Sequence, residues 1–287
     1  MSDPNKTSRR ESMRAKRSEL AAARRAEVKL QPTSKFRAVV AAVRSCRRKH
    51  SPERLIKVIG PTGAGKTTLR DYLVETLSDT MEVCAVESRD TWRPATRDLR
   101  ARCKLVVLLD LFAAFGIEPE AGARIGDVPE LEDELMAHLL EQQRVLFVDE
   151  AEFFSAYALN LFKLLLNQTR IILVVACTPR AHAKWQQWYP DEADQIARRT
   201  DATVSLEVIT PEDLGLFFAE TVFSTRPSAL EFIAREASRF GHVSLVARIH
   251  KALGAAVNVT DKQAEGFVEK ALREMGKKRM VSENRKP

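Results

Sequence analysis

The stretch of the chain that most restricts its fold runs from Gly60 to Thr67. It fits the pattern GxxxxGK[ST] at every fixed position. An apolar, strand-like run over 55–59 precedes it, and a helix-forming stretch over 66–77 follows it. Strand, glycine-rich loop and helix in this order predict a phosphate-binding loop, because the backbone N–H groups at a helix N-terminus attract phosphate. The loop reads Gly60-Pro61-Thr62-Gly63-Ala64-Gly65-Lys66-Thr67.

Each fixed position of this loop has a chemical reason. Glycines at 63 and 65 leave room for a phosphate to reach the backbone. The ammonium of Lys66 suits the β- and γ-phosphate oxygens, and the hydroxyl of Thr67 suits a Mg²⁺ ion. With Thr68 beside them, the loop residues form the predicted site for the cofactors ATP and Mg²⁺.

In a second motif, an apolar run over 145–148 is followed by the acidic pair Asp149 and Glu150. At the tip of a buried strand, Asp149 is placed to hold the Mg²⁺ shell and Glu150 to polarise the attacking water. An apolar strand that ends in two acids is common by itself. After a phosphate-binding loop, it predicts ATP hydrolysis rather than binding alone.

A third apolar run, over 171–177, ends in Thr178. In P-loop sheets of this arrangement, the strand beside the acidic one ends near the γ-phosphate, where a hydroxyl can orient water. Thr178 is therefore a candidate catalytic residue. The alternative is that Thr178 only opens the turn before Pro179.

Two arginines, Arg198 and Arg199, lie just before the last predicted strand, on a segment without an evident apolar face. An arginine projected from a subunit edge into a neighbour's γ-phosphate would stabilise transition-state charge. We prefer Arg199 for this role, with Arg198 close behind. The alternative is a pair of surface arginines at a solvated helix end.

Composition divides the chain into four segments. Residues 1–34 form a polar, Ala- and Arg-rich arm. Residues 35–209 alternate short apolar runs with amphipathic stretches, which is typical of a parallel sheet flanked by helices. Residues 210–276 show only helical patterns and predict a small all-helical lid domain, and 277–287 form a basic tail.

The predicted fold class is therefore α/β, a P-loop domain with a five-stranded parallel sheet and the helical lid. The expected strands are 55–59, 82–86, 145–148, 171–176 and 203–206. The expected helices are 35–49, 66–77, 95–115, 131–142, 156–167, 214–223, 229–240, 244–256 and 261–275.

Positive charge is concentrated at the start of the chain. Residues 1–50 hold 15 of the 46 Lys and Arg but only 4 of the 39 Asp and Glu, a balance of +11, whereas the remaining residues balance to −4. Such a segment suits a polyanion, because each cation at a phosphate releases condensed counterions. The alternative is a solvated tail that aids solubility.

Other features exclude several classes of protein. No apolar run approaches the ~18 residues of a membrane span, so we expect no membrane partner and a cytoplasmic location. The four cysteines, Cys46, Cys84, Cys103 and Cys177, lack the paired spacing of a metal site. We expect them to be reduced thiols in the core.

The phosphate-binding loop, the acidic strand, the Thr-tipped strand, the paired arginines and the helical lid resemble AAA+ ATPases over roughly residues 36–275. The compact size, the Thr-Pro-Glu-Asp start of the lid and the basic arm are most similar to transposition-regulator ATPases of the MuB, TnsC and IstB kind, and to the related ExeA-type ATPases. This resemblance implies a homo-oligomer, a ring or helical filament, with ATP at the subunit interfaces. It also implies binding to double-stranded DNA without sequence preference, and recruitment or activation of a transposase.

The resemblance also points to residues outside the loop. Lids of this family usually supply a sensor arginine about three residues after a helix-breaking glycine, but Gly241 is followed there by Ser244. Arg248, one helical turn further on, is the candidate substitute at the nucleotide.

In the related transposition ATPases, the segment after the second strand faces DNA. Arg89, Arg93 and Arg97 are therefore candidate phosphate contacts. The alternative is that these arginines pair with Asp90 and Asp98 at a helix N-terminus.

Two other functions stay open at this stage. One is a helicase-loader-type replication ATPase, and the other is a switch or secretion-associated ATPase that binds no DNA. The basic arm argues against the DNA-free switch, which has no need of it.

Overall fold

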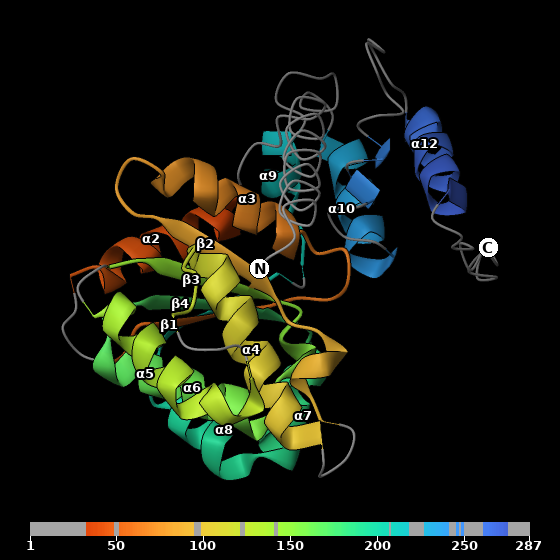
Figure 1. Cartoon of the computed structure of the whole chain (residues 1–287). Helices are drawn as coiled ribbons and strands as arrows, with labels where there is room; N and C mark the ends of the chain where they lie inside the picture. Colours follow the sequence, from red (N-terminus) through yellow and green to blue (C-terminus); the bar gives the residue numbers. More distant parts are fainter. Residues whose placement is uncertain are drawn as a thin grey trace, which may run out of the picture. The chain divides into compact units, whose positions relative to one another are not determined.

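A five-stranded parallel sheet forms the centre of the molecule, with the strand order β2-β3-β4-β1-β5 (Figure 1). The computed structural model describes residues 33–48, 52–94, 99–120, 124–140, 143–206, 208–217, 227–240, 245–246, 248–249 and 261–274. The strands are β1 (Leu55–Ile59), β2 (Val83–Glu87), β3 (Val145–Asp149), β4 (Ile172–Cys177) and β5 (Thr200–Ser205). The predicted fold class is confirmed.

The central strands are buried on both faces. Along β3, Leu146 and Val148 pack into one core, whereas Val145 and Phe147 pack into a second core on the opposite face. This alternation follows from the two-residue period of a strand. The near-continuous apolar sequences of β1, β3 and β4 therefore reflect a parallel sheet covered on both sides.

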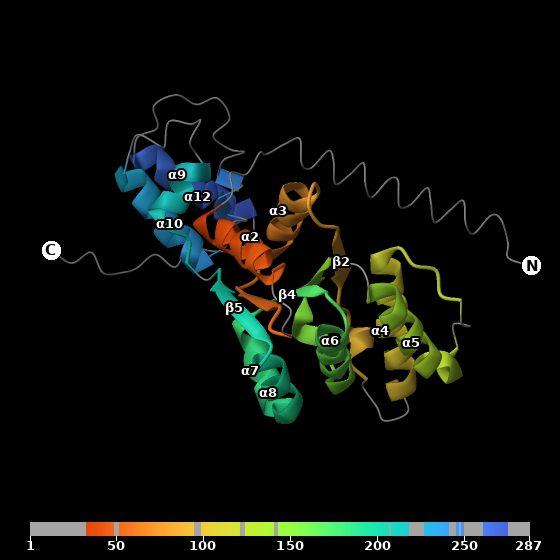
Figure 2. The same ribbon diagram turned by 90° about the vertical axis from the view of Figure 1, so that its left-hand side faces the viewer.

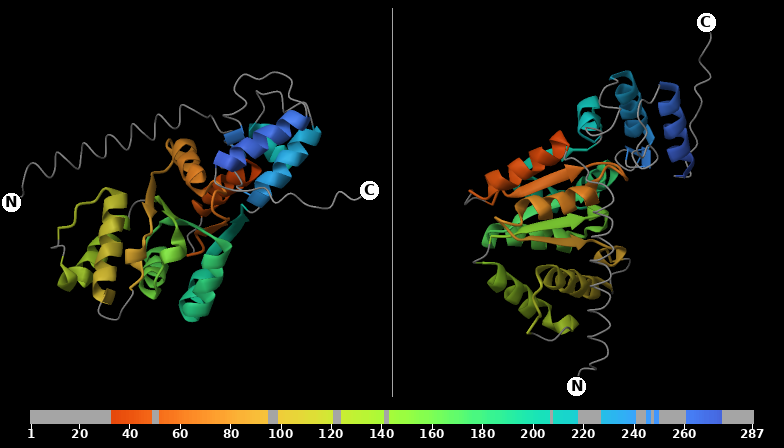
Figure 3. Two further views of the ribbon diagram at one scale, coloured as in Figure 1. Left: turned by 90° about the vertical axis from the view of Figure 1, so that its right-hand side faces the viewer. Right: turned by 90° about the horizontal axis from the view of Figure 1, so that it is seen from above.

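Helices cover the two faces of the sheet (Figures 2 and 3). On one face lie α2 (Ser34–Cys46) and α3 (Lys66–Leu77). The other face carries α4 (Arg100–Phe115), α5 (Val128–Leu139), α6 (Ala156–Gln168), α7 (Pro179–Trp188) and α8 (Pro190–Ala197). The described residues of this region also form the short 3-10 turns η1 (Asp90–Trp92), η3 (Ile125–Asp127) and η4 (Ala151–Phe153).

Two predictions about the segment before β5 are wrong. No helix is predicted between β4 and β5 from the sequence, whereas the structure has α7 and α8 there, each beginning at a proline. Both helices are short and bury few side chains, so the sequence offers few apolar positions by which to recognise them; α7 buries Ala181 and Trp185, and α8 buries Ala193 and Ile196. The segment before Arg199 therefore does have an apolar face, and β5 begins at Thr200 rather than at residue 203.

The described part of the lid consists of α9 (Pro211–Phe217), α10 (Pro227–Phe240) and α12 (Asp261–Glu274). As predicted, Thr210 opens α9: its hydroxyl accepts the Asp213 backbone N–H at 3.1 Å. The carboxylate of Asp213 is buried and also accepts the backbone N–H and the hydroxyl of Ser34, at 3.0 and 2.9 Å. These bonds join the start of the lid to the start of α2.

Several predictions lie outside the described residues. These include residues 1–32 of the arm, the basic tail and most of the expected helix over 244–256. None of the helices in the described ranges is long and apolar enough to cross a membrane. All four cysteines are free and buried.

Candidate nucleotide-binding site

The predicted phosphate-binding loop connects β1 to α3, with two glycines in a left-handed conformation. Gly63 has φ 84° and Gly65, the N-cap of α3, has φ 88°. A side chain is strained in this region, whereas glycine adopts it freely. The loop can therefore turn tightly and enter α3 with its first N–H groups unobstructed.

Gly60 is needed for a different reason. A Cβ atom there would lie 2.8 Å from the Cβ of Leu206 and 3.0 Å from the Cβ of Ala64. Since real Cβ atoms essentially never approach to under 3.0 Å, only glycine fits between the loop and the end of β5. This position is fixed by packing inside the protein.

Lys66 is buried within the loop and is only 6% exposed. Its ammonium donates to the carbonyl oxygens of Gly60 and Pro61, at 3.1 and 3.2 Å. An ammonium group has three donors, so these two bonds hold the cation in the loop and leave a donor for a phosphate oxygen.

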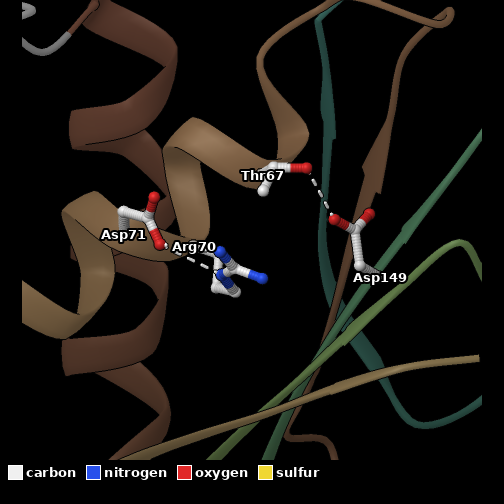
Figure 4. A network of polar contacts seen from close by, with 4 residues as sticks. All are labelled: Thr67, Arg70, Asp71 and Asp149. Carbon is white, nitrogen blue, oxygen red and sulfur yellow. Dashed lines mark hydrogen bonds and ion pairs between the residues drawn. The ribbon is translucent and has the colours of Figure 1, made fainter. Parts of the chain in front are cut away.

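Thr67 and Asp149 meet where α3 begins and β3 ends (Figure 4). The Thr67 hydroxyl donates to Asp149 Oδ2 at 2.9 Å, and Asp149 Oδ1 accepts the backbone N–H of Glu150, also at 2.9 Å. Asp149 is 5% exposed. A hydroxyl and a carboxylate that converge in this way are the hard oxygen ligands that Mg²⁺ prefers, so the residues present fit that ion.

Glu150 has an unusual backbone conformation. Its φ of 53° is positive, which is unique among the non-glycine residues that the structure describes. Its carbonyl oxygen accepts the hydroxyl of the buried Ser88, which follows β2. A left-handed residue that is not glycine costs about 1–3 kcal/mol and is found most often at functional sites.

The side chain of Glu150 lies in an acidic environment. Burial raises the pKa of this carboxyl, the negative charges of Glu152 and Asp149 raise it further, and the Lys66 ammonium acts in the opposite direction. Three carboxylates and one ammonium thus face the same edge of the sheet.

Glu152 is a site residue that the sequence analysis missed. Its Oε1 accepts the backbone N–H of Thr178 at 2.7 Å, and its Oε2 is buried without a hydrogen-bond donor among the described residues. It thereby links the end of β4 to the acidic end of β3. The available signal was a third acid, two residues after Glu150.

Thr178 lies where expected, at the end of β4 and next to β3. However, its hydroxyl accepts the backbone N–H of Ala181 at 3.3 Å and so caps α7. The structure therefore gives Thr178 the turn-opening role of the alternative interpretation, and a role in orienting water stays a prediction.

The arginines before β5 differ from one another. Arg198 is exposed at the C-terminal end of α8. Arg199 donates through Nε to Asn167 Oδ1 at 2.8 Å and through a second nitrogen to the Gln195 carbonyl. Arg199 is thus held within its own chain, and a role in a neighbouring subunit stays a prediction.

The candidate lid sensor is also engaged elsewhere in the protein. The guanidinium of Arg248 forms an ion pair with Glu274 of α12 at 3.6 Å. Gly241 and Ser244 lie outside the described residues. The nucleotide contact assigned to Arg248 stays a prediction.

The candidate DNA contacts after β2 make contacts within the protein. Arg89 forms an ion pair with Asp110 of α4 at 3.0 Å, rather than with Asp90. The guanidinium of Arg93 lies 4.0 Å from the centre of the Trp188 ring. Arg97 and Asp98 lie outside the described residues.

The sequence was also compared with known families and structures. Residues 47–184 match the family model described as "AAA domain". Among solved structures, the ORC2 protein of Aeropyrum pernix aligns with a TM-score of 0.51 and 16% identity, covering 88% of this chain and 71% of that protein. The chain has the AAA+ P-loop fold. Together with the assembled site, the AAA-domain match supports ATPase activity.

Other AAA+ structures are similar at lower scores. Cdc6p of Pyrobaculum aerophilum aligns with a TM-score of 0.46 and 15% identity, over 86% of this chain and 81% of that one. Domain III of the Thermotoga maritima replication initiation protein DnaA aligns with a TM-score of 0.46 and 13% identity, over 83% and 91%. No curated protein matches the chain significantly.

Proposed function

We propose that this AAA+ protein is an ATPase that binds duplex DNA in an ATP-dependent manner and without sequence preference. The observation that carries the DNA-linked part is the charge asymmetry, a balance of +11 over residues 1–50 against −4 over the rest of the chain. The nucleotide-linked part rests on the convergence of Lys66, Thr67 and Asp149 at one edge of the sheet. The A. pernix ORC2 structure was solved as ADPNP and ADP complexes, so a protein of this fold does hold adenine nucleotides.

The binding step follows from the loop. The two loop carbonyls hold the Lys66 ammonium in place, and its remaining donor is directed to the β- and γ-phosphate oxygens. The N–H groups at the start of α3 orient the phosphates. Thr67 and Asp149 would hold Mg²⁺, which when bound neutralises charge on the phosphates. Gly63 and Gly65 keep the loop free of side chains that would block this approach.

The hydrolytic step is assigned to Glu150. Its carboxylate accepts a proton from the attacking water, and its left-handed backbone fixes the direction in which the side chain leaves the strand. Glu152, in the turn η4 directly after Glu150, accepts the N–H of Thr178 at the end of the neighbouring strand β4 and so supports this geometry. A correctly positioned general base contributes about 10²–10⁴-fold to a rate.

For the assembly and the protein partner, we propose that the protein forms a homo-oligomer on DNA and recruits or activates a transposase. This partner comes from the resemblance to the MuB, TnsC and IstB group and from the basic arm. Pull-down with purified transposase and with replicative helicase separates this role from helicase loading. Retention of the helicase alone would contradict the transposase assignment.

The DNA-linked proposal is tested by fluorescence anisotropy on two unrelated duplexes, with ATP, ADP or no nucleotide, over a salt series. We expect binding to both duplexes, strongest with ATP. Affinity should fall with salt at a log–log slope of about −0.9 per phosphate contact. If the protein binds neither duplex at low salt with ATP, the proposal is wrong and a DNA-free switch is the better account.

A further inference from the structure

A hollow of about 740 Å³ lies between α2 and α3, away from the phosphate-binding loop. The two helices lie side by side on one face of the sheet (Figure 2). Cationic and hydroxyl-bearing side chains form much of its lining. These are Arg37, Arg44, Arg48, Ser45, Tyr72 and Thr76.

The three arginines form one stripe. Arg37 and Arg44 are seven residues apart on one side of α2, and Arg48, four residues further on, lies in the turn that follows the helix and lines the same hollow. All three are exposed, and none forms an ion pair with any described residue. Their guanidinium groups are available to a ligand.

The structure of the protein does not require these arginines. The apolar side of α2, with Phe36, Val39 and Val43, is buried against the sheet, and the arginines lie beside it on the exposed flank that faces α3. One exposed arginine elsewhere, Arg89, has an acidic partner within the chain, Asp110. In contrast, the sequence from residue 28 to 52 contains no acidic residue at all.

The dimensions of the stripe fit a nucleic-acid backbone. At a rise of 1.5 Å per residue, the eleven-residue step from Arg37 to Arg48 spans about 16 Å. One DNA strand carries a charge about every 3.4 Å of helix axis, so this length matches about five successive phosphates. The planar guanidinium pairs with phosphate in two-pronged fashion, and the hydroxyls of Tyr72 and Thr76 add neutral donors beside it.

We propose that the hollow between α2 and α3 binds the phosphate backbone of duplex DNA through Arg37, Arg44 and Arg48. This inference rests on the proposed DNA binding and names the surface that performs it. Contacts to phosphates alone predict binding that is sequence-independent and sensitive to salt. The acidic surface of a second copy of the chain is the competing occupant.

The test uses the full chain and a matched control. The double variant Arg44→Gln/Arg48→Gln removes two charges from the hollow, and Arg170→Gln/Arg180→Gln removes two exposed arginines elsewhere. Anisotropy on two unrelated duplexes should show that the first variant loses about two units of salt slope and on the order of tenfold or more in affinity at ~0.1 M salt. The control should change little, and DNA-free ATP hydrolysis should be the same in both.

Two outcomes distinguish the proposal that the hollow binds DNA from the broader proposal that the protein binds DNA. If wild-type protein binds DNA and the hollow variant binds with the same slope and affinity as the control, the hollow is not the DNA surface, although DNA binding stands. If wild-type protein fails to bind, both proposals are wrong. Arg44→Lys/Arg48→Lys should keep most of the slope, because the charge is retained.

The competing occupant has its own signature. If the glutamine variant binds DNA normally but assembles less than the control in light scattering, the hollow contacts another copy of the chain and the DNA assignment is overturned.

Discussion

The molecule has two places where phosphate is expected, and they differ in every physical respect. In the loop, one cation, Lys66, is 6% exposed, is held by two carbonyls and acts on the nearby carboxyl of Glu150. In the hollow, Arg37, Arg44 and Arg48 are exposed and have no acidic partner among the described residues. The first place is shaped before any ligand arrives, whereas the second is an open row of charge.

This difference determines what each place can recognise. A buried cation with fixed neighbours selects a ligand of defined shape, and bulk salt screens it little. An exposed row of arginines can bind any regular polyanion, and the affinity of that binding falls steeply as the salt concentration rises. Nucleotide affinity should therefore be nearly independent of the salt concentration that abolishes DNA binding.

The strongest test of the loop compares Lys66→Ala with Glu150→Gln. Lys66→Ala should weaken nucleotide binding by about 30-fold or more, since truncating a buried charge partner costs about 2–5 kcal/mol. Glu150→Gln should bind nucleotide normally and hydrolyse it about 10³-fold more slowly. Fluorescent-nucleotide titration and phosphate-release assays measure the two effects. Wild-type turnover in Glu150→Gln would remove that residue from its assigned role.

Arg199 is less buried than Lys66 and less exposed than the arginines of the hollow. Its guanidinium donates to two neutral acceptors, Asn167 Oδ1 and the Gln195 carbonyl. If it acts across an interface, Arg199→Ala should lose about 10³-fold in hydrolysis alone. Mixed with Lys66→Ala subunits it should recover part of the activity, since each variant supplies what the other lacks. The matched control is Arg198→Ala, which removes the neighbouring arginine. No recovery from folded, assembled mixtures would identify Arg199 as a surface residue that supports α8.

Deleting the arm tests whether the hollow acts alone. The deletion should stop at residue 31, because the Thr33 hydroxyl accepts the Phe36 N–H and caps α2. Residues 1–31 hold nine Lys and Arg against four Asp and Glu. Their loss should flatten the salt slope by about 0.9 for each phosphate contact removed and leave hydrolysis intact. An unchanged slope would assign DNA binding to the hollow without the arm.

The smallest expected effect concerns the tightness of the loop. Gly60→Ala places a Cβ 2.8 Å from Leu206 and should destabilise the fold by about 1–3 kcal/mol. Gly126→Ala is the control, because nothing lies within 4 Å of its added Cβ. Thermal unfolding should show a lower Tm for Gly60→Ala, by roughly 2–4 °C per kcal/mol. Equal Tm values would mean that the end of β5 moves aside at little cost.

The sequence was most informative where function depends on neighbours along the chain. The phosphate-binding loop, β1 and α3 were predicted with the bounds that the structure has, because strand, loop and helix are contiguous. The acidic pair at the end of β3 was found for the same reason. In both cases a local pattern carries the complete signal.

Contacts between distant segments were not predictable in this way. The bond from Thr178 N–H to Glu152 depends on β3 and β4 being neighbours and on the turn that follows Glu150. Likewise, the hydrogen bond from Arg199 to Asn167 joins the residue before β5 to α6. Side-chain partners across the sheet depend on strand order and register, which no local pattern records.

The bond between Ser34 and Asp213 has a thermodynamic consequence. Ser34 begins the helix that carries the arginine stripe, and Asp213 lies in the first turn of the lid. A lid movement that breaks this bond therefore acts on α2 as well. Linkage between two sites is reciprocal: whatever factor ATP contributes to DNA affinity through this bond, DNA contributes to ATP affinity. Under the proposed function, DNA is therefore an allosteric effector of ATP binding.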